Sequence, residues 1–156
     1  YEKDNEWHTE SVGTIGDPAK IPLPVDISIT ADDKHLWVNT WNDGMTRVFD
    51  ISDPHNAKEV YTHKIGDQVN MLSQSWDGKR VYYTSSLLAN WDKADGPEKM
   101  PQFFKAYHYK DGKLEFQWSL DFAKEKLGMP HQMRFGAYSL YSKSPKGGAK
   151  VAELSK

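Results

Sequence analysis

The chain has 156 residues, 38% of them hydrophobic, and this composition is sufficient for one folded core and argues against wholesale disorder. Its 20 basic and 22 acidic residues give a net charge of −2, which excludes a protein that binds nucleic acid through a strong basic excess. The absence of cysteine excludes disulfides, zinc–thiolate sites, iron–sulfur clusters and a cysteine nucleophile, and no apolar run approaches the roughly 18 residues of a membrane span.

The first 24 residues are predicted to be irregular or to end a preceding blade, because glycines and prolines punctuate them. Short segments that alternate between apolar and polar residues then follow, separated by polar or Asp-Gly turns. This pattern predicts a first set of four strands at residues 25–30, 36–40, 46–51 and 58–65.

The same pattern returns and predicts a second set of four strands at residues 69–75, 80–85, 103–109 and 114–120. Residues 121–128 then read as a short helical turn, with Asp121 as its N-cap and Gly128 at its end. We expect residues 123–142 to form a ring-closing or site segment, and residues 143–156, rich in Lys, Ser, Gly and Ala, to form a flexible tail.

The two sets of strands are related by an internal repeat. The turns at residues 31–34 and 76–79 superimpose at an offset of 45 residues, and so do the strands that follow them. Four short strands repeating at about 45 residues is the period of a β-propeller blade, whereas an ordinary meander or sandwich is the alternative. We therefore expect an all-β fold with one blade at residues 25–66 and a second at residues 67–122, the latter carrying a long loop at residues 87–102.

Two blades do not close a propeller, because closed propellers have 4–8 blades and open ones leave strand edges exposed. We expect the chain to belong to a larger, seven-bladed propeller. The remaining blades would come from the rest of the polypeptide, from another chain or from further copies of this chain.

His131 is the first candidate for a functional residue, because it follows Pro130 and precedes a short apolar run that contains Arg134. A neutral imidazole is the commonest side-chain metal ligand. No two histidines show a local metal-binding spacing, so a packed or surface histidine is the alternative, and any metal centre would have to be completed from elsewhere.

Two further candidates lie outside that segment. The long loop holds Asn90-Trp91-Asp92-Lys93, and loops of this length are often functional, although a solvated insertion is the alternative. Asp26 lies on the first strand of a blade, where it would face the central channel as a ligand contact or simply hydrate it. No Walker loop, nucleophile elbow or dinucleotide fingerprint is present, which argues against nucleotide binding and serine-hydrolase chemistry.

Several motifs occur in an order that is typical of one family. They are Pro24-Val25-Asp26-Ile27-Ser28-Ile29, Asp50-Ile51-Ser52-Asp53-Pro54, Trp76-Asp77-Gly78-Lys79-Arg80, Trp91-Asp92-Lys93 and His131-Gln132-Met133-Arg134-Phe135. From about residue 24 to residue 136 the chain resembles the C-terminal part of the selenium-binding protein family, which includes bacterial methanethiol oxidases.

The resemblance implies a β-propeller and a copper-dependent oxidase of small thiols, which converts methanethiol, oxygen and water to formaldehyde, hydrogen sulfide and hydrogen peroxide. The family's motif places a copper ligand at the position of His131. The other histidine ligands of the family have no matching positions in this chain. Arg134 would line the site through its guanidinium fork, and Asp92 would accept a hydrogen bond from a ligand imidazole. The partners implied are a small thiol and oxygen, with no nucleic acid and no membrane span, and the compartment implied is the periplasm.

The sequence also departs from the family. After the arginine the family usually has Tyr-Pro-Gly-Gly-Asp, whereas this chain reads Phe135-Gly136-Ala137-Tyr138-Ser139. One alternative is therefore a non-enzymatic propeller module that binds selenium, a metal or a protein. Another is a structural chain that completes the propeller of a different protein.

Overall fold

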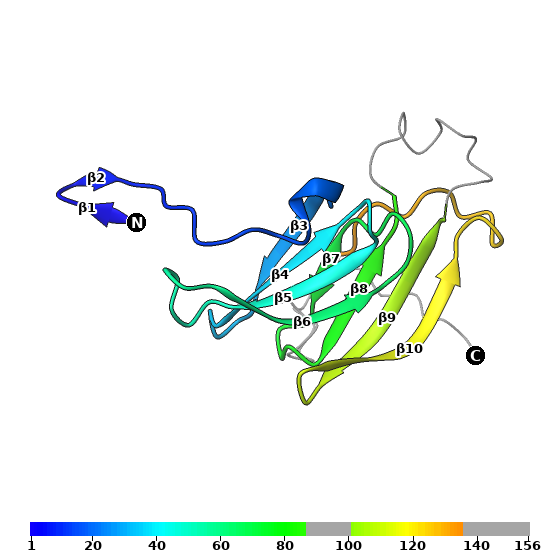
Figure 1. Ribbon diagram of the computed structural model, residues 1–156. Helices are drawn as coiled ribbons and strands as arrows, with labels where there is room; N and C mark the ends of the chain where they lie inside the picture. The colour runs from blue at the N-terminus through cyan, green and yellow to red at the C-terminus, as the bar shows by residue number, and fades with distance from the viewer. Residues whose placement is uncertain (87–100, 136–156) are drawn as a thin grey trace.

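The computed structural model describes residues 1–86 and 101–135 (Figure 1). Apart from one turn of 3-10 helix, the regular structure of these residues is all β, as the sequence predicts. Every one of the eight predicted strands is present, shifted by no more than a few residues. The first sheet holds β3 (Pro24–Ile29), β4 (His35–Thr40), β5 (Met45–Asp50) and β6 (Lys58–Lys64), and the second holds β7 (Leu72–Gln74), β8 (Arg80–Thr84), β9 (Phe103–Lys110) and β10 (Lys113–Asp121).

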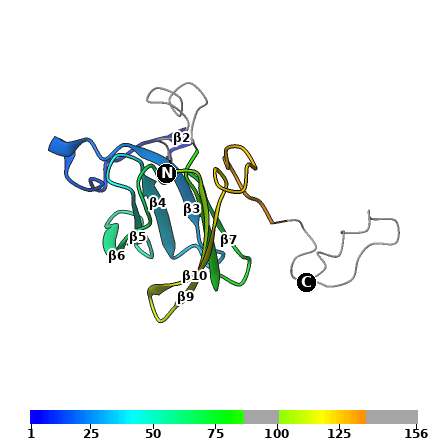
Figure 2. The same cartoon turned by 90° about the vertical axis from the view of Figure 1, so that its right-hand side faces the viewer.

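Each sheet is a four-stranded antiparallel meander whose strands follow sequence order. The first strands of the two sheets, β3 and β7, lie next to each other, and the other strands extend outward from them (Figures 1 and 2). Side chains of β3 bond to β7: the Leu72 N–H donates to the Asp26 carboxylate at 2.7 Å, and the Gln74 amide donates to the Ser28 hydroxyl at 2.8 Å. This is the arrangement of two neighbouring blades in a propeller, so the predicted fold class is confirmed.

The hydrophobic core lies between the two blades. Trp37 and Val48 of the first blade pack against apolar residues of the second, and the Trp37 ring meets Tyr109 edge-on with 4.8 Å between ring centroids. Large aromatic side chains bury much area in such contacts, so they fix the two sheets relative to each other. The second blade contributes Leu72, Val81, Tyr83, Phe103, Tyr107 and Leu114, and the connection between the blades adds Ile65 and Val69.

The segment before the first blade, which the sequence predicts to be irregular or to end a preceding blade, contains a short hairpin and one helical turn. Strands β1 (Glu2–Lys3) and β2 (Glu6–Trp7) form a small hairpin that stands away from the two sheets (Figure 1). A single turn of 3-10 helix, η1 (Pro18–Lys20), follows and is capped by the Asp17 side chain. No helix in the described parts of the chain is long and apolar enough to cross a membrane.

After β10 the chain makes the predicted turn and comes back across the second blade. The Asp121 side chain accepts hydrogen bonds from the N–H groups of Ala123 and Lys124, at 3.0 and 3.1 Å. The returning segment, residues 129–135, is tied to the blade through its carbonyls: Pro130 accepts from the Ser86 N–H at 3.1 Å, His131 from the Thr84 hydroxyl at 2.6 Å, and Met133 from the Ser73 hydroxyl. These bonds place the returning segment beside the inner strand β7.

Candidate functional site

His131 is held by the end of the second blade. Its Nδ1 atom lies 3.0 Å from the carbonyl oxygen of Ser86, and the buried Asn70 amide lies beside the same nitrogen at 3.5 Å. A carbonyl can only accept a hydrogen bond, so Nδ1 carries the proton and donates it to Ser86. The other ring nitrogen, Nε2, is then left with its lone pair available, and the side chain as a whole is exposed.

This arrangement matches one ligand position of a metal site. Histidines that bind metals usually donate their second ring N–H to a carbonyl or carboxylate, which fixes the ring and its tautomer. Within residues 1–86 and 101–135, however, no group of three or more His, Cys, Asp or Glu residues could hold a metal ion. The described residues therefore fit one imidazole ligand of a copper site and do not form a complete site themselves.

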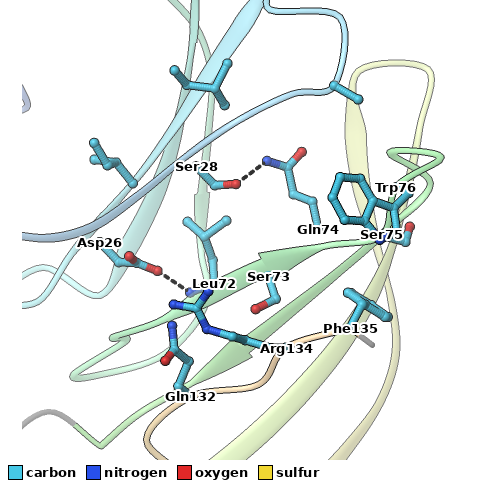
Figure 3. Close-up of a pocket in the computed structure, with 13 residues that line it drawn as sticks. Asp26, Ser28, Leu72, Ser73, Gln74, Ser75, Trp76, Gln132, Arg134 and Phe135 are labelled. Carbon is cyan, nitrogen blue, oxygen red and sulfur yellow. Dashed lines mark hydrogen bonds between the residues drawn. The ribbon is translucent and has the colours of Figure 1, made fainter. Parts of the chain in front are cut away.

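A pocket of about 390 Å³ lies close to His131, between the two inner strands and the returning segment (Figure 3). Asp26 from β3 and Arg134 from the returning segment are the charged residues among those that line it. Ser28, Gln74 and Gln132 add polar groups to the same walls. Since β3 and β7 face each other across the pocket, it occupies the position where a propeller has its central channel.

Asp26 is the acidic group of this pocket. Burial raises the pKa of its carboxyl group, since desolvation disfavours the charged form. The Leu72 N–H, which donates to Oδ2 at 2.7 Å, opposes that rise in pKa, and so do the electrostatic interactions with Arg134 and His131. The carboxylate is thus oriented by the neighbouring blade and lies within electrostatic reach of the returning segment.

Arg134 is exposed at the edge of the pocket, and its guanidinium group points toward Asp26 (Figure 3). No hydrogen bond or ion pair joins the Arg134 side chain to another residue in the described parts of the chain. The structure therefore brings two predicted site residues, His131 and Arg134, together on one segment and adds Asp26 beside them. Asp92, the third predicted site residue, lies outside the described residues.

Other residues of the site could not be recognised as such from the sequence. Gln74 faces Ser28 across the pocket although 46 residues separate them, and Asn70 reaches His131 across 61 residues. Alternation along β3 does give a partial signal, because Asp26 and Ser28 fall on the same face of a strand. No local pattern marks Asn70 as a neighbour of His131.

Comparisons with known proteins agree on one family. The model of the 56 kDa selenium-binding proteins matches residues 1–139. The methanethiol oxidase of Ruegeria pomeroyi is 54% identical over 143 residues, which are 91% of this chain and 32% of that protein. The methanethiol oxidase of a Hyphomicrobium species is 58% identical over 132 residues, which are 85% of this chain and 30% of that protein.

A solved structure supports the same relationship. The X-ray structure of a hypothetical selenium-binding protein from Sulfolobus tokodaii aligns with a TM-score of 0.66 and 30% sequence identity. The alignment covers 77% of this chain and 33% of that one. The chain thus spans about a third of the length of the proteins it matches.

Proposed function

Because the chain belongs to the 56 kDa selenium-binding protein family, we propose that it forms part of a copper-dependent oxidase of small thiols. The reaction proposed is the conversion of methanethiol, oxygen and water to formaldehyde, hydrogen sulfide and hydrogen peroxide. Two relatives that are more than half identical to it over most of its length bear the name methanethiol oxidase, and this supports the proposal. The compartment proposed is the periplasm.

His131 would supply one ligand to the copper through Nε2. The Ser86 carbonyl holds the opposite ring nitrogen at 3.0 Å, so the ring is oriented before any metal binds. When bound, copper would supply the electron-accepting chemistry that a thiol oxidase needs. The remaining ligands would come from parts of the propeller other than residues 1–86 and 101–135.

Arg134 would stabilise negative charge on the sulfur substrate, because its guanidinium group is permanently cationic and is not paired within the described residues. Asp92 would accept a hydrogen bond from a ligand imidazole, as carboxylates beside metal sites commonly do. The single observation that carries the proposal is the carbonyl-anchored His131 ring beside the channel pocket.

The test is the copper content and the oxidase activity of the protein with the N-terminal part of the family propeller supplied. His131→Ala should lower the bound copper and abolish methanethiol-dependent oxygen consumption. His108→Ala is the matched control, because His108 is exposed on β9 and does not line the channel pocket. Unchanged copper content in His131→Ala would contradict the ligand role.

A non-enzymatic binding module is the second candidate. It is favoured by the absence, among the described residues, of a group of three or more metal-ligating side chains. This candidate predicts no oxygen consumption with methanethiol even when the N-terminal part is supplied. Oxygen consumption that depends on both methanethiol and copper would rule it out.

A further inference from the structure

The channel pocket separates charged groups from aromatic ones. Asp26, Arg134 and Gln132 gather at one end, while Trp76 and Phe135 lie at the other (Figure 3). Trp76 is 60% exposed, so a large part of its surface is free to pack against a ligand. The pocket volume of about 390 Å³ lies within the usual range for small-molecule sites, which is roughly 300 to 1,000 Å³.

The two charges at the polar end do not neutralise each other by direct contact. No ion pair within 4.0 Å joins Asp26 to Arg134, although the guanidinium charge is close enough to lower the pKa of the carboxyl group. One oxygen of Asp26 is already held by the Leu72 N–H at 2.7 Å, which fixes the direction of the carboxylate. Asp26 and Arg134 therefore face one pocket with opposite charges, and each can still bind a further partner.

The charge pattern selects among ligands. A simple anion would be attracted by Arg134 and repelled by Asp26. A simple cation would be attracted by Asp26 and repelled by Arg134. A molecule that carries an ammonium and a carboxylate group on neighbouring atoms offers each side chain its opposite charge. Arginine is well suited to the carboxylate half, because its planar fork donates two parallel hydrogen bonds.

We propose that the channel pocket binds the zwitterionic head of an α-amino acid, with the apolar side chain of the ligand lying against Trp76 and Phe135. Asp26 takes the ammonium group, and Arg134 takes the carboxylate. The amides of Gln132 and Gln74 supply further hydrogen bonds at the same walls. This site goes beyond the proposed oxidase and requires neither copper nor a thiol.

The aromatic end identifies a suitable probe. A thioether is flexible and polarisable, and its sulfur makes favourable contacts with aromatic rings. L-methionine therefore combines the required head with a side chain that suits Trp76 and Phe135. N-acetyl-L-methionine lacks the positive charge and L-methioninamide lacks the negative charge, so the three compounds separate the contributions of Asp26 and Arg134.

The experiment is isothermal titration calorimetry of the metal-free chain with these three compounds. L-methionine should bind saturably, and each derivative should bind about tenfold or more weakly, because each loses a charge-assisted hydrogen bond. Equal binding of N-acetyl-L-methionine would mean a plain anion site and would overturn the proposal. The absence of saturable binding by L-methionine would overturn it as well.

Two variants assign the discrimination to residues. Asp26→Asn should weaken the binding of L-methionine but not that of N-acetyl-L-methionine, because it also removes the carboxylate that repels a simple anion. Arg134→Gln should weaken the binding of L-methionine but not that of L-methioninamide, because it also removes the guanidinium group that repels a simple cation. Glu115→Gln, which removes an exposed carboxylate of β10, is the control and should bind L-methionine as the original chain does. Equal loss of binding in the control would overturn the assignment.

The design keeps this inference separate from the oxidase. Binding is measured without copper and without methanethiol, so failure of either proposal leaves the other standing. If Asp26→Asn fails to fold, the three ligands on the unaltered chain and the Arg134→Gln variant still decide the question.

Discussion

The two blades share one turn, in which only some of the residues are identical. In the first blade the Thr30 hydroxyl donates to the aspartate two residues later at 2.6 Å, and in the second blade the Ser75 hydroxyl does the same at 2.5 Å. In both turns the next residue has a left-handed backbone, with φ of 57° at Asp33 and 67° at Gly78. The repeat therefore preserves the hydrogen-bond geometry of the turn, although threonine is exchanged for serine and aspartate for glycine.

The blades differ where the second strand ends. In the first blade the buried Arg47 donates to Asp43 at 2.8 Å and to Thr40 at 2.7 Å, which closes a short turn. In the second blade Ser85 stands 45 residues after Thr40, and its hydroxyl bonds to the backbone of residues 101 and 103. It donates to the Pro101 carbonyl at 2.6 Å and accepts from the Phe103 N–H at 2.9 Å.

This difference shows how two blades use one position in two ways. A hydroxyl at the end of the second strand satisfies buried polar groups in both blades, but its partners are a charged turn in one and the backbone of residues 101 and 103 in the other. The first blade thus depends on a buried charge, and the second depends on neutral hydrogen bonds. The predictions that follow use this contrast.

Removal of Arg47 should have the largest effect on stability. Arg47→Met keeps most of the side-chain volume but removes the partly buried ion pair to Asp43 and the hydrogen bond to Thr40, which should cost about 2–3 kcal/mol. Urea unfolding should show a lower free energy of unfolding with little change in slope. A loss below about 1 kcal/mol would mean that this pair does not hold the first blade together.

Acid should weaken the same turn, though less than deletion of Arg47, because protonation of Asp43 leaves both side chains in place. Burial alone would raise the pKa of Asp43, but hydrogen bonds from Thr40 and Arg47 and the guanidinium charge lower it overall. An aspartate in the unfolded chain has a pKa of about 3.9, and Asp43 in the folded chain has a lower one. The stabilisation by Asp43 is therefore complete above about pH 3.9 and is lost as the pH falls through the pKa of the folded state.

The measurement is urea unfolding between about pH 5 and pH 2, compared with Asp43→Asn. Other aspartates with lowered pKa values, such as Asp77, add to the decline in the original chain and remain in the variant. The free energy of unfolding of the variant should therefore decline less steeply with falling pH. Parallel curves would show that Asp43 does not contribute to the acid sensitivity.

Ser85 should matter less than Arg47, because its hydrogen bonds are neutral. Ser85→Ala leaves the Phe103 N–H and the Pro101 carbonyl without this partner, which costs about 1–3 kcal/mol where the groups are buried. Urea unfolding measures the loss, and Ser119→Ala, at an exposed position of β10, is the matched control. A larger loss for Ser85→Ala than for Arg47→Met would reverse the contrast between the blades.

The sequence predicted the strands well because strand formation is encoded locally, in alternation and in turn residues such as Asp111-Gly112. No hairpin is predicted at residues 2–7 because its strands are too short to show an alternating pattern, although Asp4 and Asn5 at its turn both have positive φ and belong to residue types that tolerate it.

The site was predicted only in part. His131 and Arg134 were identified through a contiguous motif, which a single sequence displays. The pocket depends on how β3 packs against β7, and the orientation of His131 depends on Ser86, which is 45 residues away. Contacts of this kind are set by the packing of two blades, and no local pattern in the sequence carries that information.

The smallest effect is expected at the left-handed turn position. In Gly78 an added Cβ atom meets nothing within 4 Å, so a substitution there is opposed by backbone conformation alone. Gly78→Ala should cost about 1 kcal/mol in urea unfolding. Gly78→Asp should cost about half as much, because a short polar side chain tolerates this conformation and Asp33 already occupies the equivalent position in the first blade. If Gly78→Asp costs as much as Gly78→Ala, the two turns are not interchangeable, and the repeat does not extend to this position.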